Sequence, residues 1–177
     1  ITVEDPVEIQ VEGVTQIQVH AEIGYTFARA LRAILRQDPD VIMIGEIRDL
    51  ETAEIAIQSA LSGHLVLSTL HTNDALSSFT RLIDMGLEPF LVAAPLKGVQ
   101  AQRLVRRLCV HCSLPSEPRN DVRNQLFNIP SEILGSDWRV PKGCDACHGT
   151  GYSGRLGIYQ MVAVDDAIRD MIVKGAT

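Results

Sequence analysis

Two aliphatic runs set among helical segments constrain the fold of this chain more than any other feature. The first, Val-Ile-Met-Ile at 41–44, is unbroken, and the second lies within residues 64–70. Neither run alternates apolar with polar side chains, a pattern typical of parallel strands that are buried on both faces. Segments of helical composition lie at 24–38, 49–63 and 74–86. Strands and helices that alternate in this order predict a parallel sheet with crossover helices.

The two ends of the chain add further elements. Residues 1–5 are rich in β-branched side chains and predict a strand. Residues 155–164 predict a last strand, which leads into a short helix with Asp165 as its N-cap. The side chains that we expect this helix to bury are Ile168, Met171 and Ile172.

Composition and charge limit the class of protein. Hydrophobic residues make up 46% of the 177 residues and charged residues 21%, which is typical of a globular chain. We find no signal peptide and no apolar run near the roughly 18 residues that span a bilayer, so we expect a cytoplasmic protein. The net charge of −6 argues against a nucleic-acid partner. A local basic cluster, Arg103, Arg106 and Arg107, is interpreted as a solvated helix face.

An acidic residue follows the first aliphatic run. Gly45 and Glu46 come directly after Ile44, and they should stand at the carboxyl end of the sheet, where α/β folds place ligands. A carboxylate at this place in phosphate-loop ATPases holds Mg²⁺ through water or polarises the attacking water. Taken alone, the pattern also fits an ordinary exit from a strand into a loop.

Polar side chains follow the other predicted strands as well. Glu4 and Asp5 end the first strand, although two adjacent acids are also common at turns. His71 lies beside Thr69 and Asn73 after residues 64–68, which makes it a candidate sensor of a γ-phosphate. A lone histidine is more often structural. Three strand ends with such residues predict one shared site.

Three motifs in sequence carry a family resemblance. The stretches TVEDPVE (2–8), DPDVIMIGEIRD (38–49) and GHLVLSTLHTNDA (63–75) resemble the aspartate box, Walker B box and histidine box of the secretion ATPase superfamily. The chain is most similar to the hexameric motors of type II secretion and type IV pilus assembly. The resemblance implies an α/β fold with a RecA-like parallel sheet, truncated here, and an ATPase activity for the full-length protein.

The resemblance also implies roles for individual residues and for partners. Glu4 would be the catalytic or water-positioning acid, and Glu46 would organise Mg²⁺ and water. The candidate cofactor-binding residues are Asp5, Arg29, Arg32, Arg48 and His71. The implied cofactors are ATP and Mg²⁺. The implied assembly is a homo-hexamer that is peripheral to the inner membrane and acts with the platform proteins of the secretion or pilus apparatus.

The phosphate-binding loop of such enzymes is missing from the sequence. No GxxxxGK[ST] motif occurs in the 177 residues, whereas in the resembled family this loop precedes the aspartate box. Backbone amides and the lysine of that loop supply most of the nucleotide affinity. We therefore expect the chain to be the C-terminal part of a motor and to be inactive by itself.

Four cysteines form a second constellation. Cys109 and Cys112 make one C-x₂-C pair, Cys144 and Cys147 make another, and 31 residues separate the pairs. Paired thiolates at this spacing predict a structural, tetrahedral Zn²⁺ site. Disulfides are disfavoured in the cytosol and a redox role needs only one pair. Two histidines are weaker alternative ligands, namely His111 and His148.

The zinc element also bears on function. In the resembled family, assembly and export motors carry four such cysteines and retraction motors generally lack them, so export or assembly is favoured. We expect three regions: the ATPase core at 1–108, the zinc element at 109–154 and a strand and helix at 155–177. The alternative function is a zinc-stabilised docking module without catalysis, which a parent gene that starts near Ile1 would favour.

Overall fold

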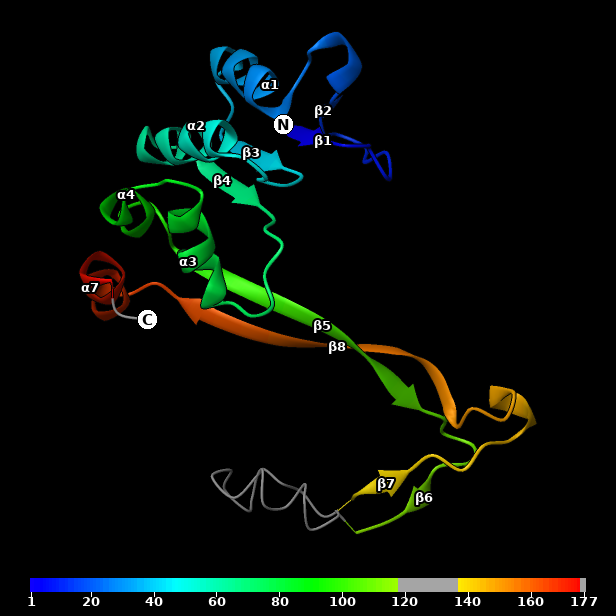
Figure 1. Ribbon diagram of the computed structural model, residues 1–177. Helices are drawn as coiled ribbons and strands as arrows, with labels where there is room; N and C mark the ends of the chain where they lie inside the picture. The colour runs from blue at the N-terminus through cyan, green and yellow to red at the C-terminus, as the bar shows by residue number, and fades with distance from the viewer. Residues whose placement is uncertain (118–136, 176–177) are drawn as a thin grey trace. The chain divides into compact units, whose positions relative to one another are not determined.

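A computed structural model describes residues 1–117 and 137–175. The chain divides into two compact units (Figure 1). The first unit comprises Ile1–Ala101 with Gln160–Thr177, and the second comprises Gln102–Tyr159. We describe each unit by itself.

A four-stranded parallel sheet forms the centre of the first unit. Its strands are β1 (Thr2–Glu4), β2 (Gln16–Gln18), β3 (Val41–Ile44) and β4 (Leu65–Ser68). They are ordered β2-β1-β3-β4, and all three neighbouring pairs run parallel. The parallel sheet and the strands at 1–5, 41–44 and 64–70 are therefore confirmed.

Helices connect and cover these strands. They are η1 (Ala21–Ile23), α1 (Phe27–Ile34), η2 (Leu35–Gln37), α2 (Leu50–Leu61), α3 (Ser77–Asp84), α4 (Pro89–Ala93) and α7 (Asp166–Lys174). α1 packs against β1 and α2, and α2 packs against β4. Figure 1 shows α1 and α2 along the same side of the sheet. Within the described residues, no helix has the length and apolar character that crossing a membrane requires.

Within the described residues, one face of the sheet is buried and the other is largely exposed. The side chains on the buried face include Val3, Ile42 and Ile44, which belong to the same apolar core as residues of α1 and α2. The alternate positions face the other way: Val41, Leu65 and Leu67 are 42%, 53% and 51% exposed. The expectation that β3 and β4 are buried on both faces is therefore wrong for the described residues. The aliphatic run is continuous, but helices cover one side of it.

Side chains cap the N-termini of α1, α2 and α7. Asp49 Oδ1 accepts a hydrogen bond from Thr52 N (2.8 Å) at the start of α2, and Asp165 Oδ1 accepts one from Ile168 N (2.9 Å) at α7. Thr26 caps α1 in the same way. The predicted cap at Asp165 is confirmed. The burial expected for α7 is only partly right, because Met171 is 54% exposed. α7 packs against α4; Ile172 is buried and Ile168 packs, partly buried, against the same core.

In the part of the second unit that the structure describes, a long ribbon is the main regular element. Strands β5 (Gly98–Leu108) and β8 (Tyr152–Ala163) pair as a two-stranded sheet; β5 begins in the first unit and continues into the second, whereas β8 begins in the second unit and ends in the first. The shorter β6 (Leu114–Pro115) and β7 (Arg139–Val140) are antiparallel, and η3 (Asp145–Cys147) follows them. The predicted helix face at 103–107 is wrong, because these arginines lie on β5. Their helical spacing is a local pattern, which pairing with a distant strand overrides.

The cap at Asp49 provides a test of how the segment after β3 is held. We expect Asp49→Ala to lower the free energy of unfolding of the first unit by about 1 kcal/mol, since the N–H of Thr52 loses its partner. Urea denaturation followed by far-UV circular dichroism measures the change. Glu54→Ala, at an exposed position of the same helix, is the control. Equal effects of the two substitutions would contradict the capping role.

Candidate functional site

The carboxyl ends of β1 and β3 meet at one edge of the sheet. β1 pairs with β3 in a register that sets Val3 beside Ile44, and Gly45 N donates to Val3 O at 2.7 Å. Glu4, the last residue of β1, and Glu46, two residues beyond β3, are thus delivered to the same edge. Neighbouring parallel strands end together in this way, and ligands of α/β folds bind at such edges.

Gly45 allows the two strand ends to approach closely. A Cβ atom at this position would lie 3.1 Å from Val3 O and 3.4 Å from Glu4 Cα, which is tighter than nearly all such contacts. Hydrogen bonds also join the segment after β4 to the segment after β3. Thr69 Oγ1 donates to Gly45 O at 2.6 Å, and Ile47 N donates to Thr69 O at 3.1 Å. The sequence places Thr69 beside the candidate phosphate sensor His71, and in this structure the Thr69 hydroxyl binds the backbone oxygen of Gly45. The three strand ends form one connected edge.

Glu46 is the most strongly bound acidic side chain at this edge. Its Oε2 atom accepts hydrogen bonds from Arg48 Nε at 2.5 Å and from His71 Nε2 at 3.1 Å. Because a carboxylate only accepts, His71 must carry a proton on Nε2. The side chain of Glu46 is only 12% exposed. The hydrogen bond from Arg48 holds the pKa of Glu46 below its usual range; burial opposes this effect and His71 adds to it.

Glu4 is held by two neutral donors. Thr2 Oγ1 donates to Glu4 Oε1 at 2.6 Å, and Gln16 Nε2 donates to the same atom at 2.9 Å. Both hydrogen bonds stabilise the ionised form of Glu4 and lower its pKa; the bond from Thr2 has the larger effect. Sequence reasoning missed both donors. The i, i+2 spacing of Thr2 and Glu4 in one strand could have indicated the first donor. Spacing could not have indicated the second, because the pairing of β1 with β2 brings Gln16 to Glu4.

The remaining cofactor-binding candidates lie in different surroundings. Arg48 binds Glu46; this hydrogen bond raises the pKa of Arg48, and the charge of Asp5 adds a smaller effect. Arg32 Nη2 instead bonds Glu51 Oε1 at 2.7 Å, which links α1 to α2. Arg29 Nη1 reaches Gly24 O at 3.5 Å. The structure thus brings Arg48, and not the two arginines of α1, into contact with Glu46.

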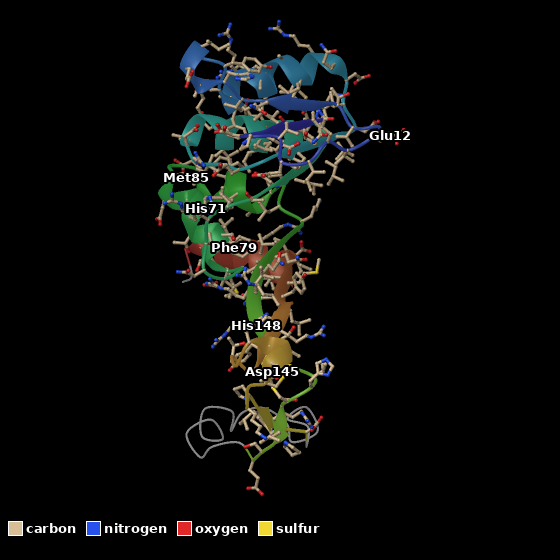
Figure 2. The ribbon with its side chains drawn as sticks, turned by 90° about the vertical axis from the view of Figure 1, so that its right-hand side faces the viewer. Glu12, His71, Phe79, Met85, Asp145 and His148 are labelled. Atoms are coloured by element: carbon tan, nitrogen blue, oxygen red, sulfur yellow. The ribbon has the colours of Figure 1, made fainter. Side chains whose placement is uncertain are left out.

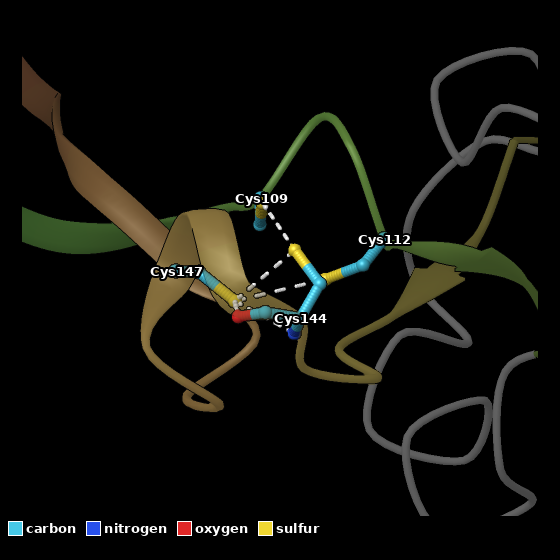
Figure 3. A group of neighbouring side chains, drawn as sticks. All are labelled: Cys109, Cys112, Cys144 and Cys147. Atoms are coloured by element: carbon cyan, nitrogen blue, oxygen red, sulfur yellow. Dashed lines mark hydrogen bonds between the residues drawn. The ribbon is translucent and has the colours of Figure 1, made fainter.

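The four cysteines of the second unit converge, as expected (Figure 3). Their Sγ atoms all lie within 4.8 Å of one another. The individual separations are 3.9 Å for Cys109–Cys144, and 3.8 Å for both Cys112–Cys147 and Cys144–Cys147. All four thiols are free, and a disulfide would need about 2.05 Å. The cluster is therefore a candidate metal centre.

The separations are compatible with a tetrahedral metal site. Four sulfurs at about 2.3 Å from a tetrahedral Zn²⁺ lie about 3.8 Å from one another. The two histidines considered as alternative ligands stay outside: His111 and His148 are exposed and do not join the group. Figure 2 shows His148 on the turn at η3, next to Asp145. The donor set is four sulfur atoms.

Backbone amides surround the sulfurs. Gly143 N donates to Cys112 Sγ at 3.3 Å, and both Cys144 N and Gly151 N donate to Cys147 Sγ at 3.2 Å. Two glycines make this possible, since a Cβ at Gly143 would lie 2.5 Å from Gly149 O and one at Gly151 would lie 2.4 Å from Pro141 Cβ. Both have positive φ. The turns are built around the sulfur atoms.

The amides also affect the acidity of one thiol. Burial opposes ionisation of Cys147, but the N–H groups of Cys144 and Gly151 outweigh it and lower the pKa to about 6. Burial raises the pKa of Cys144 to about 11, with the neighbouring thiols adding to the effect. A cluster that already stabilises one thiolate is suited to a cation, because thiolates are the form that binds metals.

Comparison with known proteins places the chain in a family. The family model described as "Type II/IV secretion system protein" matches residues 1–177. The type II secretion system protein HxcR of Pseudomonas aeruginosa is 57% identical over 99% of this chain and 33% of its own length. The type IV pilus assembly ATPase PilB of Thermus thermophilus is 54% identical over 98% of this chain and 20% of its own length. The chain thus spans a third or less of these relatives.

Solved structures agree on the fold. The pilus retraction motor PilT, with bound ADP, is 31% identical, has a TM-score of 0.66, and is matched over 98% of this chain and 41% of that chain. The ATPase DotB of Legionella pneumophila has a TM-score of 0.60 over 98% of this chain and 39% of its own, and at 22% identity it supports the fold alone. From the full-length match to the family model and the identity to these relatives, the chain belongs to the family of type II/IV secretion system proteins.

Proposed function

We propose that this chain is part of an ATP-hydrolysing motor that drives type II protein secretion or type IV pilus assembly. One observation carries the proposal: Glu4 and Glu46 end adjacent parallel strands, and Arg48 and His71 both bind Glu46. Relatives named as secretion and pilus assembly proteins support the choice of process. The motor would act as a homo-hexamer with inner-membrane platform proteins, on the cytoplasmic side of that membrane.

The two glutamates would have different roles in hydrolysis. Bound Mg²⁺ would neutralise charge on the phosphates and orient water. Both donors of Glu46 bind Oε2, so among the described side chains Oε1 remains the atom for a further hydrogen bond, which suits an organiser of metal-bound water. Glu4 would position the attacking water. Both side chains are held ionised, as an acceptor of water protons must be.

Arg48, Asp5 and His71 complete the proposed nucleotide side of the site. Arg48 and His71 already bind a carboxylate, and phosphate oxygens could compete for the same donors. Arg29 and Arg32 remain proposed phosphate contacts, and they would have to leave their present partners to reach a nucleotide. An arginine can exchange such an exposed ion pair at little cost, since surface pairs contribute less than about 1 kcal/mol.

The site also requires a phosphate-binding loop, which we propose that a longer protein supplies. The exposed sheet face with Val41, Leu65 and Leu67 supports this, because aliphatic side chains at such a density are normally covered. The length of the relatives supports it too, as this chain spans about a third of the type II proteins. Residues 1–108 would then form part of a RecA-like core.

We propose Zn²⁺ as the resident ion of the four-cysteine cluster at 109–154. Four thiolate ligands leave no open position, so the ion would be structural. It would hold the second unit, where the buried apolar cluster of the described residues consists of Cys109, Cys112 and Cys147. Export and assembly motors of the resembled family share this element, which supports assembly or secretion over retraction.

The roles of the glutamates can be tested in the full-length protein. We expect Glu4→Gln and Glu46→Gln each to reduce ATP turnover at least about 100-fold, while the affinity for ATP changes only a few-fold. Steady-state hydrolysis and equilibrium nucleotide binding measure the two quantities. Glu51→Gln, which removes an exposed partner of Arg32, is the matched control. Undiminished hydrolysis in both variants would favour the docking module without catalysis.

The metal can be tested by elemental analysis of the purified chain. We expect about one zinc per chain, lost on Cys144→Ser and retained on His148→Ser, because only the cysteine belongs to the cluster. Amide spectra by NMR should show changes spread through the second unit in the cysteine variant and an intact sheet in the first. A metal-free wild-type protein with four reactive thiols and an unchanged spectrum would disprove the assignment.

The need for further chain predicts the behaviour of these 177 residues alone. We expect no detectable ATP hydrolysis, no six-subunit ring, and Mg-ATP binding no tighter than the millimolar range, roughly −4 kcal/mol. Without a phosphate loop, a few exposed side chains cannot bind the nucleotide more tightly than this. Titration calorimetry and analytical ultracentrifugation are the measurements. Micromolar binding or a stable hexamer would mean that the chain holds a complete site.

A further inference from the structure

One side chain, Gln16, connects the carboxylate of Glu4 to the loop between β1 and β2. Gln16 Nε2 donates to Glu4 Oε1 at 2.9 Å and to the backbone oxygen of Ile9 at 3.0 Å. On the same amide, Oε1 accepts a hydrogen bond from Val11 N at 2.7 Å. The amide group of Gln16 therefore has three partners, on two different segments of the chain.

These contacts fix which way the amide points. The N–H of Val11 can only donate, so the atom that faces it must be the oxygen of Gln16. The nitrogen is then directed at Glu4 and at the carbonyl of Ile9, both of which can only accept in these bonds. Thr2, the other side-chain donor to Glu4, carries a hydroxyl that can rotate. Of these two side-chain donors, Gln16 is the one whose orientation is set by its surroundings.

The pairing of the sheet explains how Gln16 reaches Glu4. β1 and β2 run parallel with Thr2 beside Gln16 and Glu4 beside Gln18. Alternate side chains of a strand share a face, so all four of these polar residues project from the same side of the sheet. Gln16 thus lies diagonally across from Glu4, within reach of a long side chain.

The loop that Gln16 holds is otherwise loosely attached. Ile9 and Val11 are 74% and 52% exposed, so burial of apolar side chains contributes little to holding the loop in place. Side-chain amides bind its backbone instead: Gln16 at Ile9 and Val11, and Gln18 Oε1 at Val7 N (3.3 Å). Gln18 binds the loop without binding Glu4, which makes it a natural control.

We propose that Gln16 is a positioning residue for Glu4, which holds the carboxylate in place with an N–H whose direction is fixed by the loop at Ile9–Val11. The amide does not titrate, so it favours the ionised form of Glu4 at every pH at which the protein is folded. Displacement of the loop would withdraw this donor and leave Glu4 with Thr2. The catalytic consequence rests on the proposed function, whereas the positioning itself does not.

The positioning can be tested in this chain by following the carboxyl carbon of Glu4 by NMR as pH is varied. Gln16 donates to the charged form, so Gln16→Leu should raise the pKa of Glu4 by at least about 0.5. Gln16→Glu should raise it further, because it replaces the donor with a second carboxylate of nearly the same shape. Gln18→Leu should leave it within about 0.2 of wild type. The other donors to Glu4, Thr2 Oγ1 and the backbone N–H of Glu8, are the same in all variants, as are the charged side chains at this edge of the sheet, Asp5, Glu46 and Arg48.

Two results would overturn the proposal. One is an unchanged pKa of Glu4 in both Gln16 variants; the other is an equal rise in Gln18→Leu, which would assign the effect to the loop in general. Gln16→Glu keeps the acceptor for Val11 N, so it tests the lost donor even if Gln16→Leu disrupts the loop.

The catalytic consequence is measured in the full-length protein. Gln16→Leu should lower kcat for ATP about 10-fold or more with KM changed less than about threefold, and should move the acid limb of the pH profile upward. Gln18→Leu should match wild type. A raised pKa of Glu4 together with normal hydrolysis in Glu4→Gln would leave Gln16 as a positioning residue and refute the catalytic role of Glu4. The two hypotheses therefore fail on different measurements.

Discussion

The parallel pairing of β1 with β3 is the interaction on which the candidate site depends. The hydrogen bond from Gly45 N to Val3 O fixes which residues leave the sheet together, and a side chain at position 45 would disturb it. A shift of one residue in the pairing register of β1 with β3 would turn every side chain of the shifted strand to the other face of the sheet. Glu4 and Glu46 would then no longer project as they do, and their separate sets of donors would be lost.

The two acids at this edge are stabilised by different chemistry. Glu46 is bound by a guanidinium and an imidazole, which phosphate groups can attract away, whereas Glu4 is bound by a hydroxyl and an amide that carry no charge. Neutral donors are attracted to an entering anion less strongly than charged donors are, because charge-assisted hydrogen bonds are the stronger ones. This difference suits the separate roles proposed for the two residues.

The described part of the second unit is organised around sulfur atoms. The described residues of this unit bury cysteines where most domains bury aliphatic side chains, and glycine amides point at the sulfur atoms. Small units seldom bury enough apolar surface to fold, and a metal is a common substitute. The long β5–β8 ribbon, exposed along most of its length, adds little to a core.

The sequence by itself determined the parallel sheet, the cap at Asp165 and the four-cysteine cluster, because each depends on local periodicity or on fixed short spacing. The three boxes also placed Glu4, Glu46, Arg48 and His71 at strand ends. Only the tertiary structure decided that helices cover one face of the sheet and that the basic cluster lies on a strand. It alone placed Gln16 beside Glu4. These features arise from contacts between segments distant in sequence, and no local pattern encodes which strands become neighbours.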